Sequence, residues 1–182
     1  MAEYRRNFRP GGCYFFTQVT YRRTPWLCAG WARQALRKAI EEVRRHLPFV
    51  IEAWVLLPQH LHCIWRLPEG DSDYSTRWRL IKTSVTKHRD ESWVVLQSTG
   101  SREKRREQTL WQRRFWEHTI CDAEDYGRHC DYIHFNPVKH GLCVAPREWP
   151  YSTFHRFVKE GRYELDWGSN DPPESFEGIG HE

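Results

Sequence analysis

The chain has 182 residues, which is long enough to bury the core of one domain without help from disulfides. It holds no apolar run near the roughly 20 residues of a membrane span, and its first residues lack the hydrophobic segment of a signal peptide. The six cysteines form no CxxC pair and no zinc-ribbon spacing, so we interpret them as reduced thiols of a soluble, cytoplasmic protein.

Charge is distributed unevenly along the chain. Residues 160–182 carry seven acidic side chains and one basic side chain, a net charge of −6 within a total of +4. Residues 1–159 therefore hold 27 of the 28 basic and 17 of the 24 acidic residues, a net charge of +10. Together with ten Trp and eight Tyr, this basic body suits phosphate neutralisation and base stacking. A solvated basic surface over a Trp-rich core is the alternative, and composition does not decide between the two.

Four elements are predicted in the first part of the chain. Residues 13–22 are rich in aromatic and β-branched types and predict a strand. Apolar residues recur at helical spacing over residues 29–46, and Pro48 follows as a helix stop. Residues 49–58 and 60–68 are two extended runs with almost no link between them, which favours an antiparallel hairpin.

The second part of the chain completes a βαββαβ order. Residues 74–89 predict a second helix, residues 98–109 a basic loop and residues 114–120 a fourth strand. Asp122 is placed to cap a third helix that ends near Asn136-Pro137. This order predicts an α+β fold, a ferredoxin-like sandwich with an added C-terminal helix.

The end of the chain differs from the rest in composition. Residues 159–182 are acidic, polar and rich in Gly and Pro, so we expect them to form a loosely packed tail behind a domain of residues 1–158. Tethered to a basic body, such a tail could compete weakly for a DNA path by electrostatics. A solubilising end without a regulatory role is the alternative.

Two histidines on a predicted strand form a candidate metal site. His60 and His62 are two residues apart, so both imidazoles point to the same face of the strand. Two neutral imidazoles side by side can ligate one cation. A structural or surface role fits an isolated HxH pair equally well, so the local sequence leaves both interpretations open.

The third predicted helix offers a nucleophile and a further ligand. Helical rotation separates two faces, and Tyr132 and Asn136 fall on the polar one, an unusual place for an aromatic ring unless it faces a cleft or a partner. Asn136 could offer its amide oxygen to the same cation, or it could simply end the helix before Pro137. The opposite, apolar face is predicted to contain Ala123, Tyr126, Cys130 and Ile133.

The chemistry of these residues suits phosphoryl transfer. A phenol with its usual pKa of about 10 is a poor nucleophile, and a cation that polarises the scissile phosphate supplies the missing activation. Two imidazoles and an amide oxygen are compatible with Mg²⁺ or Mn²⁺ when phosphate oxygens and water complete the shell. Zinc fits the same ligands.

Six segments, taken in order, resemble the REP-associated tyrosine transposases, relatives of the insertion-sequence transposases that carry a His-hydrophobic-His motif. Together they span most of the chain, and the ordered set is far more specific than the histidine pair or the tyrosine alone. The segments are YRRNF (4–8), AWVLLPQHLHCIW (53–65), LPEGDSDYSTRWRLIK (67–82), RFWEHTI (114–120), DYIHFNPVKHGL (131–142) and WPYSTFHRFV (149–158).

This resemblance implies a ferredoxin-like catalytic domain that nicks single-stranded DNA near short palindromic hairpins. It places the metal pair at His60 and His62 and the nucleophile at Tyr132. Asn136 matches the position of a polar third ligand, where relatives often carry Gln. The implied reaction is a transesterification that leaves a 5′-phosphotyrosine and a free 3′-hydroxyl, which can later rejoin strands without ATP.

Candidate DNA contacts come from the same family-like segments. Arg5, Arg6, Arg77 and Arg79 lie beside aromatic residues and are predicted to contact DNA, although each could instead solvate the surface. The basic loop around 102–106 looks like an insertion relative to the family pattern, and the resemblance gives it no role.

Two other functions compete with this interpretation. A non-catalytic regulator that binds hairpin DNA or RNA could use the same sheet, its aromatics and its Arg residues without cutting. A metal hydrolase of a small substrate could use His60 and His62 to activate water. The charge of the body and the position of Tyr132 argue against the hydrolase. Whether the protein acts as a monomer or a dimer is left open.

Overall fold

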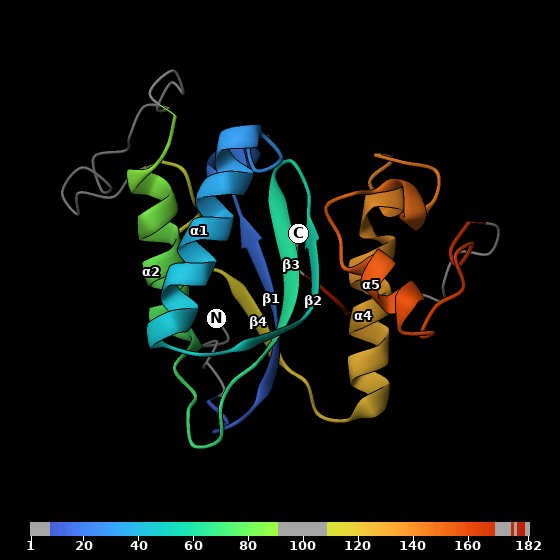
Figure 1. Cartoon of the computed structure of the whole chain (residues 1–182), viewed down its shortest axis with the longest axis horizontal. Coiled ribbons are helices and arrows are strands. Elements are labelled where there is room, and N and C mark those ends of the chain that lie inside the picture. The colour runs from blue at the N-terminus through green and yellow to red at the C-terminus, as the bar shows by residue number, and fades with distance from the viewer. Residues whose placement is uncertain (1–7, 91–108, 170–175, 177, 181–182) are drawn as a thin grey trace.

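The computed structural model describes residues 8–90, 109–169, 176 and 178–180. Its centre is a four-stranded antiparallel sheet in the order β2-β3-β1-β4 (Figure 1). The strands are β1 (Cys13–Val19), β2 (Val50–Leu56), β3 (His60–Arg66) and β4 (Trp116–Thr119). This strand order and the βαββαβ connection confirm the predicted ferredoxin-like α+β fold.

Helices α1 (Gly30–His46) and α2 (Tyr74–Lys87) cover one face of the sheet (Figure 1). Aromatic rings fill the layer between them, and Trp65 of β3 stacks on Trp78 of α2 with ring centroids 4.1 Å apart. Both indoles are fully buried, so this layer forms the larger core of the molecule.

The opposite face of the sheet packs against α4 (Ala123–Lys139), with α5 (Phe154–Lys159) farther along the chain on the same side (Figure 1). Two short 3₁₀ helices complete the described elements, at Tyr21–Arg23 and Pro146–Glu148. Alternate residues of β3 therefore enter two different cores. Leu61, Cys63 and Trp65 face α1 and α2, whereas Ile64 faces α4.

Helix α4 is longer than the sequence predicted. Asp122 caps its first turn, as expected, because its side chain accepts a hydrogen bond from the Asp125 N–H at 2.9 Å. The predicted end near Asn136-Pro137 is wrong, because the helix continues through Pro137 to Lys139. The turn beyond the proline still closes, since the His140 N–H donates to the Asn136 carbonyl at 3.0 Å. Proline therefore removes one donor here without ending the helix.

The remaining expectations about the chain have mixed outcomes. The first strand is shorter than the predicted 13–22, because a 3₁₀ turn starts at Tyr21. None of the helices in the described ranges combines the length and the hydropathy needed to cross a bilayer. The basic loop of residues 98–109 lies outside the described residues except for Thr109.

Candidate active site

The two predicted histidines lie on β3, near the middle of the sheet, and face α4. Both imidazoles are buried, with ring centroids 4.9 Å apart. Thr17 pairs with His62 across β1 and β3, and its Oγ1 lies 2.9 Å from Nδ1 of His62. This contact restrains the orientation of the His62 ring through its Nδ1 atom.

Helix α4 brings Tyr132 and Asn136 to the same place. The Tyr132 ring lies 5.1 Å from that of His62, and Oδ1 of Asn136 lies 3.4 Å from Nε2 of His60. Both residues of the helix are fully buried. The sequence therefore predicted four residues that the fold does bring together from β3 and α4.

The buried face of α4 matches the predicted apolar face only in part. Cys130 and Ile133 are buried as predicted, and His129, Tyr132 and Asn136 are buried with them, whereas Ala123 is exposed and Tyr126 only half-buried. The prediction that Tyr132 lies on a polar face opposite the apolar residues is wrong, because Tyr132 and Ile133 belong to the same buried core. His60 and His62 point from the sheet toward α4. Polar side chains of the helix can hydrogen-bond there, so they are buried on this face.

The distance between His60 and Asn136 would suit two ligands of one cation. Two ligands bound at about 2.1 Å lie roughly 3.0 to 3.4 Å apart in octahedral or tetrahedral geometry. The 3.4 Å between Nε2 of His60 and Oδ1 of Asn136 falls at the upper end of this range. A mixed set of nitrogen and oxygen donors suits Mn²⁺ and accepts Mg²⁺.

Two residues that the sequence analysis did not single out adjoin this site. Nζ of Lys139 lies 3.5 Å from the Tyr132 hydroxyl and 4.9 Å from its ring centroid. The His140 ring lies 5.0 Å from that of His60. Both follow Tyr132 at helical spacing, a signal that was lost because the helix was predicted to end at Pro137.

The C-terminal segment covers Tyr132. The Phe176 ring meets the Tyr132 ring edge to face at 5.5 Å, and Ile179 is buried in the core under α4. Gly180 has φ +69°, and a Cβ there would come within 2.4 Å of the Tyr132 hydroxyl oxygen, so only glycine fits. The expected loose packing of the tail is wrong for these residues, while the domain boundary at residue 158 stays a prediction.

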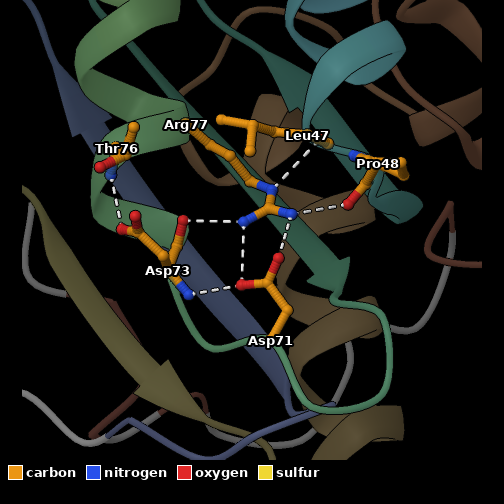
Figure 2. A network of polar contacts seen from close by, with 6 residues as sticks. All are labelled: Leu47, Pro48, Asp71, Asp73, Thr76 and Arg77. Carbon is orange, nitrogen blue, oxygen red and sulfur yellow. Dashed lines mark hydrogen bonds and ion pairs between the residues drawn. The ribbon is translucent and has the colours of Figure 1, made fainter.

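The four arginines predicted to contact DNA differ in burial and in whether the structure describes them. Arg77 is fully buried, and its guanidinium donates to both carboxylate oxygens of Asp71, at 3.2 and 2.6 Å, and to three backbone carbonyls (Figure 2). No donor remains for a phosphate, so the prediction that Arg77 contacts DNA is wrong. Arg79 is exposed on α2 and stays a prediction. Arg5 and Arg6 lie outside the described residues.

A second polar cluster, formed by His118, Asp125 and His129, adjoins the candidate active site. The Phe15 ring packs against His62 on one side, with centroids 5.4 Å apart, and against His129 on another, at 4.8 Å. His118 lies in the family-like segment RFWEHTI (114–120), but no role was predicted for it.

Known proteins resemble the chain over nearly its whole length. A REP-associated tyrosine transposase of Escherichia coli (strain K12) is 46% identical over 171 residues, 93% of each protein. A relative from Haemophilus influenzae, named for the same family, is 43% identical and aligns over 93% of this chain and 95% of its own length.

Comparison of structures leads to the same family, although no protein-family model matches the chain. A solved structure of a REP-associated tyrosine transposase bound to a REP hairpin has 44% sequence identity and a TM-score of 0.77, covering 97% of this chain and 96% of the other. Proteins with this sequence identity over this length share one fold. The chain belongs to the REP-associated tyrosine transposases.

Proposed function

We propose that this chain cuts and rejoins single-stranded DNA beside palindromic hairpins, with Tyr132 as the nucleophile and Mg²⁺ or Mn²⁺ held by His60, His62 and Asn136. One observation carries the proposal. Tyr132, the buried tyrosine of α4, packs against the histidine pair of β3, with 5.1 Å between the ring centroids of Tyr132 and His62. The hairpin in the relative's structure supports DNA of this kind as the substrate.

The proposed reaction is a transesterification at phosphorus. Tyr132 Oη forms a bond to phosphorus and gives up its proton, while the bond from phosphorus to the 3′-oxygen breaks and that oxygen takes up a proton. The products are a 5′-phosphotyrosine and a free 3′-hydroxyl. A 3′-hydroxyl can reverse the step with the phenol as leaving group, because the phosphotyrosine bond retains the energy of the phosphodiester. The bound cation would supply charge neutralisation at the phosphate.

The residues around Tyr132 have distinct tasks in this scheme. Thr17 orients His62 through the contact at 2.9 Å between Oγ1 and Nδ1. Lys139 places a positive charge beside the phenol oxygen, where it favours both an approaching phosphate and the negative charge that develops on that oxygen. The segment that holds Phe176 and Gly180 must move before DNA can reach Tyr132, because it occupies the space over the hydroxyl.

The cover over Tyr132 also favours a second candidate function, a regulator that binds hairpin nucleic acid and does not cut it. A phenol kept beneath the end of its own chain is inaccessible in the structure described. Binding through the outer surface needs no displacement of that segment.

A cleavage assay separates the two functions. The full-length protein would be mixed with a 5′- or 3′-labelled single-stranded hairpin oligonucleotide and Mn²⁺, with Tyr132→Phe as the matched variant. Cutting is expected only with the unmodified tyrosine, while both proteins bind the hairpin, because the substitution removes the hydroxyl and keeps the ring. Hairpin binding without any cut by either protein would support the regulator. Equal cutting by both would exclude Tyr132 as the nucleophile.

A further inference from the structure

Three side chains from β4 and α4 converge beside the candidate active site without belonging to it. Nε2 of His118 lies 2.8 Å from Oδ2 of Asp125. Nδ1 of His129 lies 2.9 Å from the other carboxylate oxygen and 2.8 Å from the Asp125 backbone carbonyl oxygen. The two imidazoles stack with centroids 4.6 Å apart and planes inclined by 11°. One carboxylate therefore bridges two parallel rings from different elements.

The donor atoms of this cluster are close enough to share one ion. One ligand atom from each of His118, Asp125 and His129 lies within 4.8 Å of the others. Among the described residues, no other group of three His, Cys, Asp or Glu side chains meets this distance. The Asp125 carbonyl accepts the proton of His129 Nδ1, so Nε2 is the nitrogen of His129 that an ion would bind.

The protonation states of His129 and Asp125 suit metal binding. His129 is only 4% exposed at its side chain, and its Nε2 is buried with no hydrogen-bond partner in the described ranges. Burial lowers the pKa of His129, which keeps the imidazole neutral as a ligand. Burial alone would raise the pKa of Asp125, but hydrogen bonds from Cys121 N–H and His118 lower it, so the carboxylate is charged.

The cluster has an open side. The His118 side chain is 34% exposed, while His129 closes the inner side. An ion could therefore enter from solvent and keep a position for water or a phosphate oxygen. The ring of Phe15 contacts both His62 and His129, so the cluster is next to the histidine pair of β3 but shares no ligand with it.

We propose that His118, Asp125 and His129 form a second cation site, suited to a first-row divalent ion such as Zn²⁺ or Mn²⁺. Two imidazoles and one carboxylate favour these ions over Mg²⁺, which prefers an all-oxygen shell. The ion would join the edge strand β4 to the first half of α4 and so fix the helix that carries Tyr132. Without an ion, hydrogen bonds hold the same three side chains together.

Calorimetric titration with Zn²⁺, and separately with Mn²⁺, tests the site independently of the proposed function. The protein would be full-length and carry His62→Ala, which impairs the first candidate site. We expect this variant to keep one binding event. Adding His118→Asn or Asp125→Asn should weaken that event at least tenfold, because each removes a ligand. Asp122→Asn is the matched control, since asparagine still caps α4 and the residue is no ligand.

The outcomes are distinct. Loss of binding in His118→Asn and Asp125→Asn, with Asp122→Asn unchanged and circular dichroism native for all, supports the second site. Absence of binding by His62→Ala, or equal affinity after His118→Asn, overturns it. If His62→Ala binds as tightly and with the same stoichiometry as the unmodified protein, and His118→Asn removes that binding, the second site stands while the proposed ligand role of His62 fails.

Discussion

The environment of His62 shows how one hydroxyl can control a candidate metal site. Oγ1 of Thr17 is the partner of Nδ1 at 2.9 Å, and both side chains lie in the buried layer between the sheet and α4. Because threonine and valine have nearly the same shape, Thr17→Val tests the hydrogen bond without opening a cavity.

For Thr17→Val we expect Mn²⁺ affinity at the first site to fall roughly 10- to 100-fold, the usual effect of losing the partner of a metal-binding histidine. Cleavage should fall with it and recover in part at high Mn²⁺. Calorimetric titration in a His118→Asn background would isolate the first site. An unchanged affinity there would mean that Thr17 does not orient a ligand.

Arg77 belongs to the structure rather than to the DNA surface. Its guanidinium ties α2 to the turn after α1 through the carbonyls of Leu47 and Pro48, and to Asp71 before α2 (Figure 2). A lysine cannot make these directed contacts at once, and each buried partner left unpaired costs about 1–3 kcal/mol.

Arg77→Lys should therefore lower the free energy of unfolding by about 2–4 kcal/mol, measured by urea denaturation at neutral pH. The matched control is Arg79→Lys on the exposed face of the same helix, expected within about 0.5 kcal/mol of the unmodified protein. Hydrogen bonds from Arg77 lower the pKa of Asp71. This part of the stability is thus present above about pH 4 and lost as the pH falls further. Equal stability of the two variants would refute the structural role.

At the scale of elements, the strands could be predicted from composition and spacing, but the face of α4 could not. The run from His60 to Arg66 has apolar residues on both faces because helices cover both sides of the sheet. On α4, Cys130 and Ile133 of the predicted apolar stripe are buried, but Tyr126 is only half-buried, and the buried face also includes His129 and Asn136. Which face of α4 is buried depends on the histidines of β3 that the helix packs against. The sequence of the helix alone does not contain that information.

The candidate site shows the same division. Strand periodicity placed His60 and His62 on one face. Tyr132 and Asn136 could be predicted because the family-like segment DYIHFNPVKHGL (131–142) contains both, whereas helix periodicity alone put them on the wrong face. The segment over Tyr132 could not be predicted from its charge. Earlier in the acidic end of the chain, the rings of Tyr163 and Trp167 stack with centroids 4.4 Å apart. Farther on, Gly180 fits against the phenol of Tyr132.

The position of this segment predicts a gain of activity on its removal. A protein ending at Ser169 would lose Phe176, Ile179 and Gly180 but retain Tyr163, whose hydroxyl donates to Asp131 at 2.6 Å. Cutting of a single-stranded hairpin should become faster because Tyr132 is uncovered. Initial rates at several salt concentrations measure the effect, and equal rates for both lengths at every salt would remove the steric explanation.

A point substitution gives the matched control for the truncation. Gly180→Ala adds a Cβ within 2.4 Å of the Tyr132 hydroxyl oxygen and should displace the segment without shortening the chain. Gly178→Ala is the comparison, since φ is +79° there too but no atom lies within 4 Å of the added Cβ. Faster cutting in Gly180→Ala than in Gly178→Ala would locate the effect at Tyr132.

At the scale of the whole molecule, charge separates the chain into a basic body and an acidic end. Residues 1–159 carry +10 and residues 160–182 carry −6. Phosphates bound by the body release counterions, so hairpin affinity should fall steeply with salt, by roughly 10³ or more between 50 and 200 mM if six or more phosphates are contacted. Fluorescence anisotropy across a salt series measures this slope, and a flat profile is incompatible with binding through the basic body.

A covalent link between Tyr132 and DNA is the most direct consequence of Tyr132 acting as the nucleophile. The protein ending at Ser169, incubated with a single-stranded hairpin and Mn²⁺, would be denatured, digested with trypsin and analysed by mass spectrometry. Cleavage after Arg128 and Lys139 places Tyr132 as the single tyrosine of its peptide and separates it from Tyr126. We expect a nucleotide attached through a 5′-phosphate to the peptide 129–139. DNA cut with the nucleotide on another peptide, or with none attached, would contradict it.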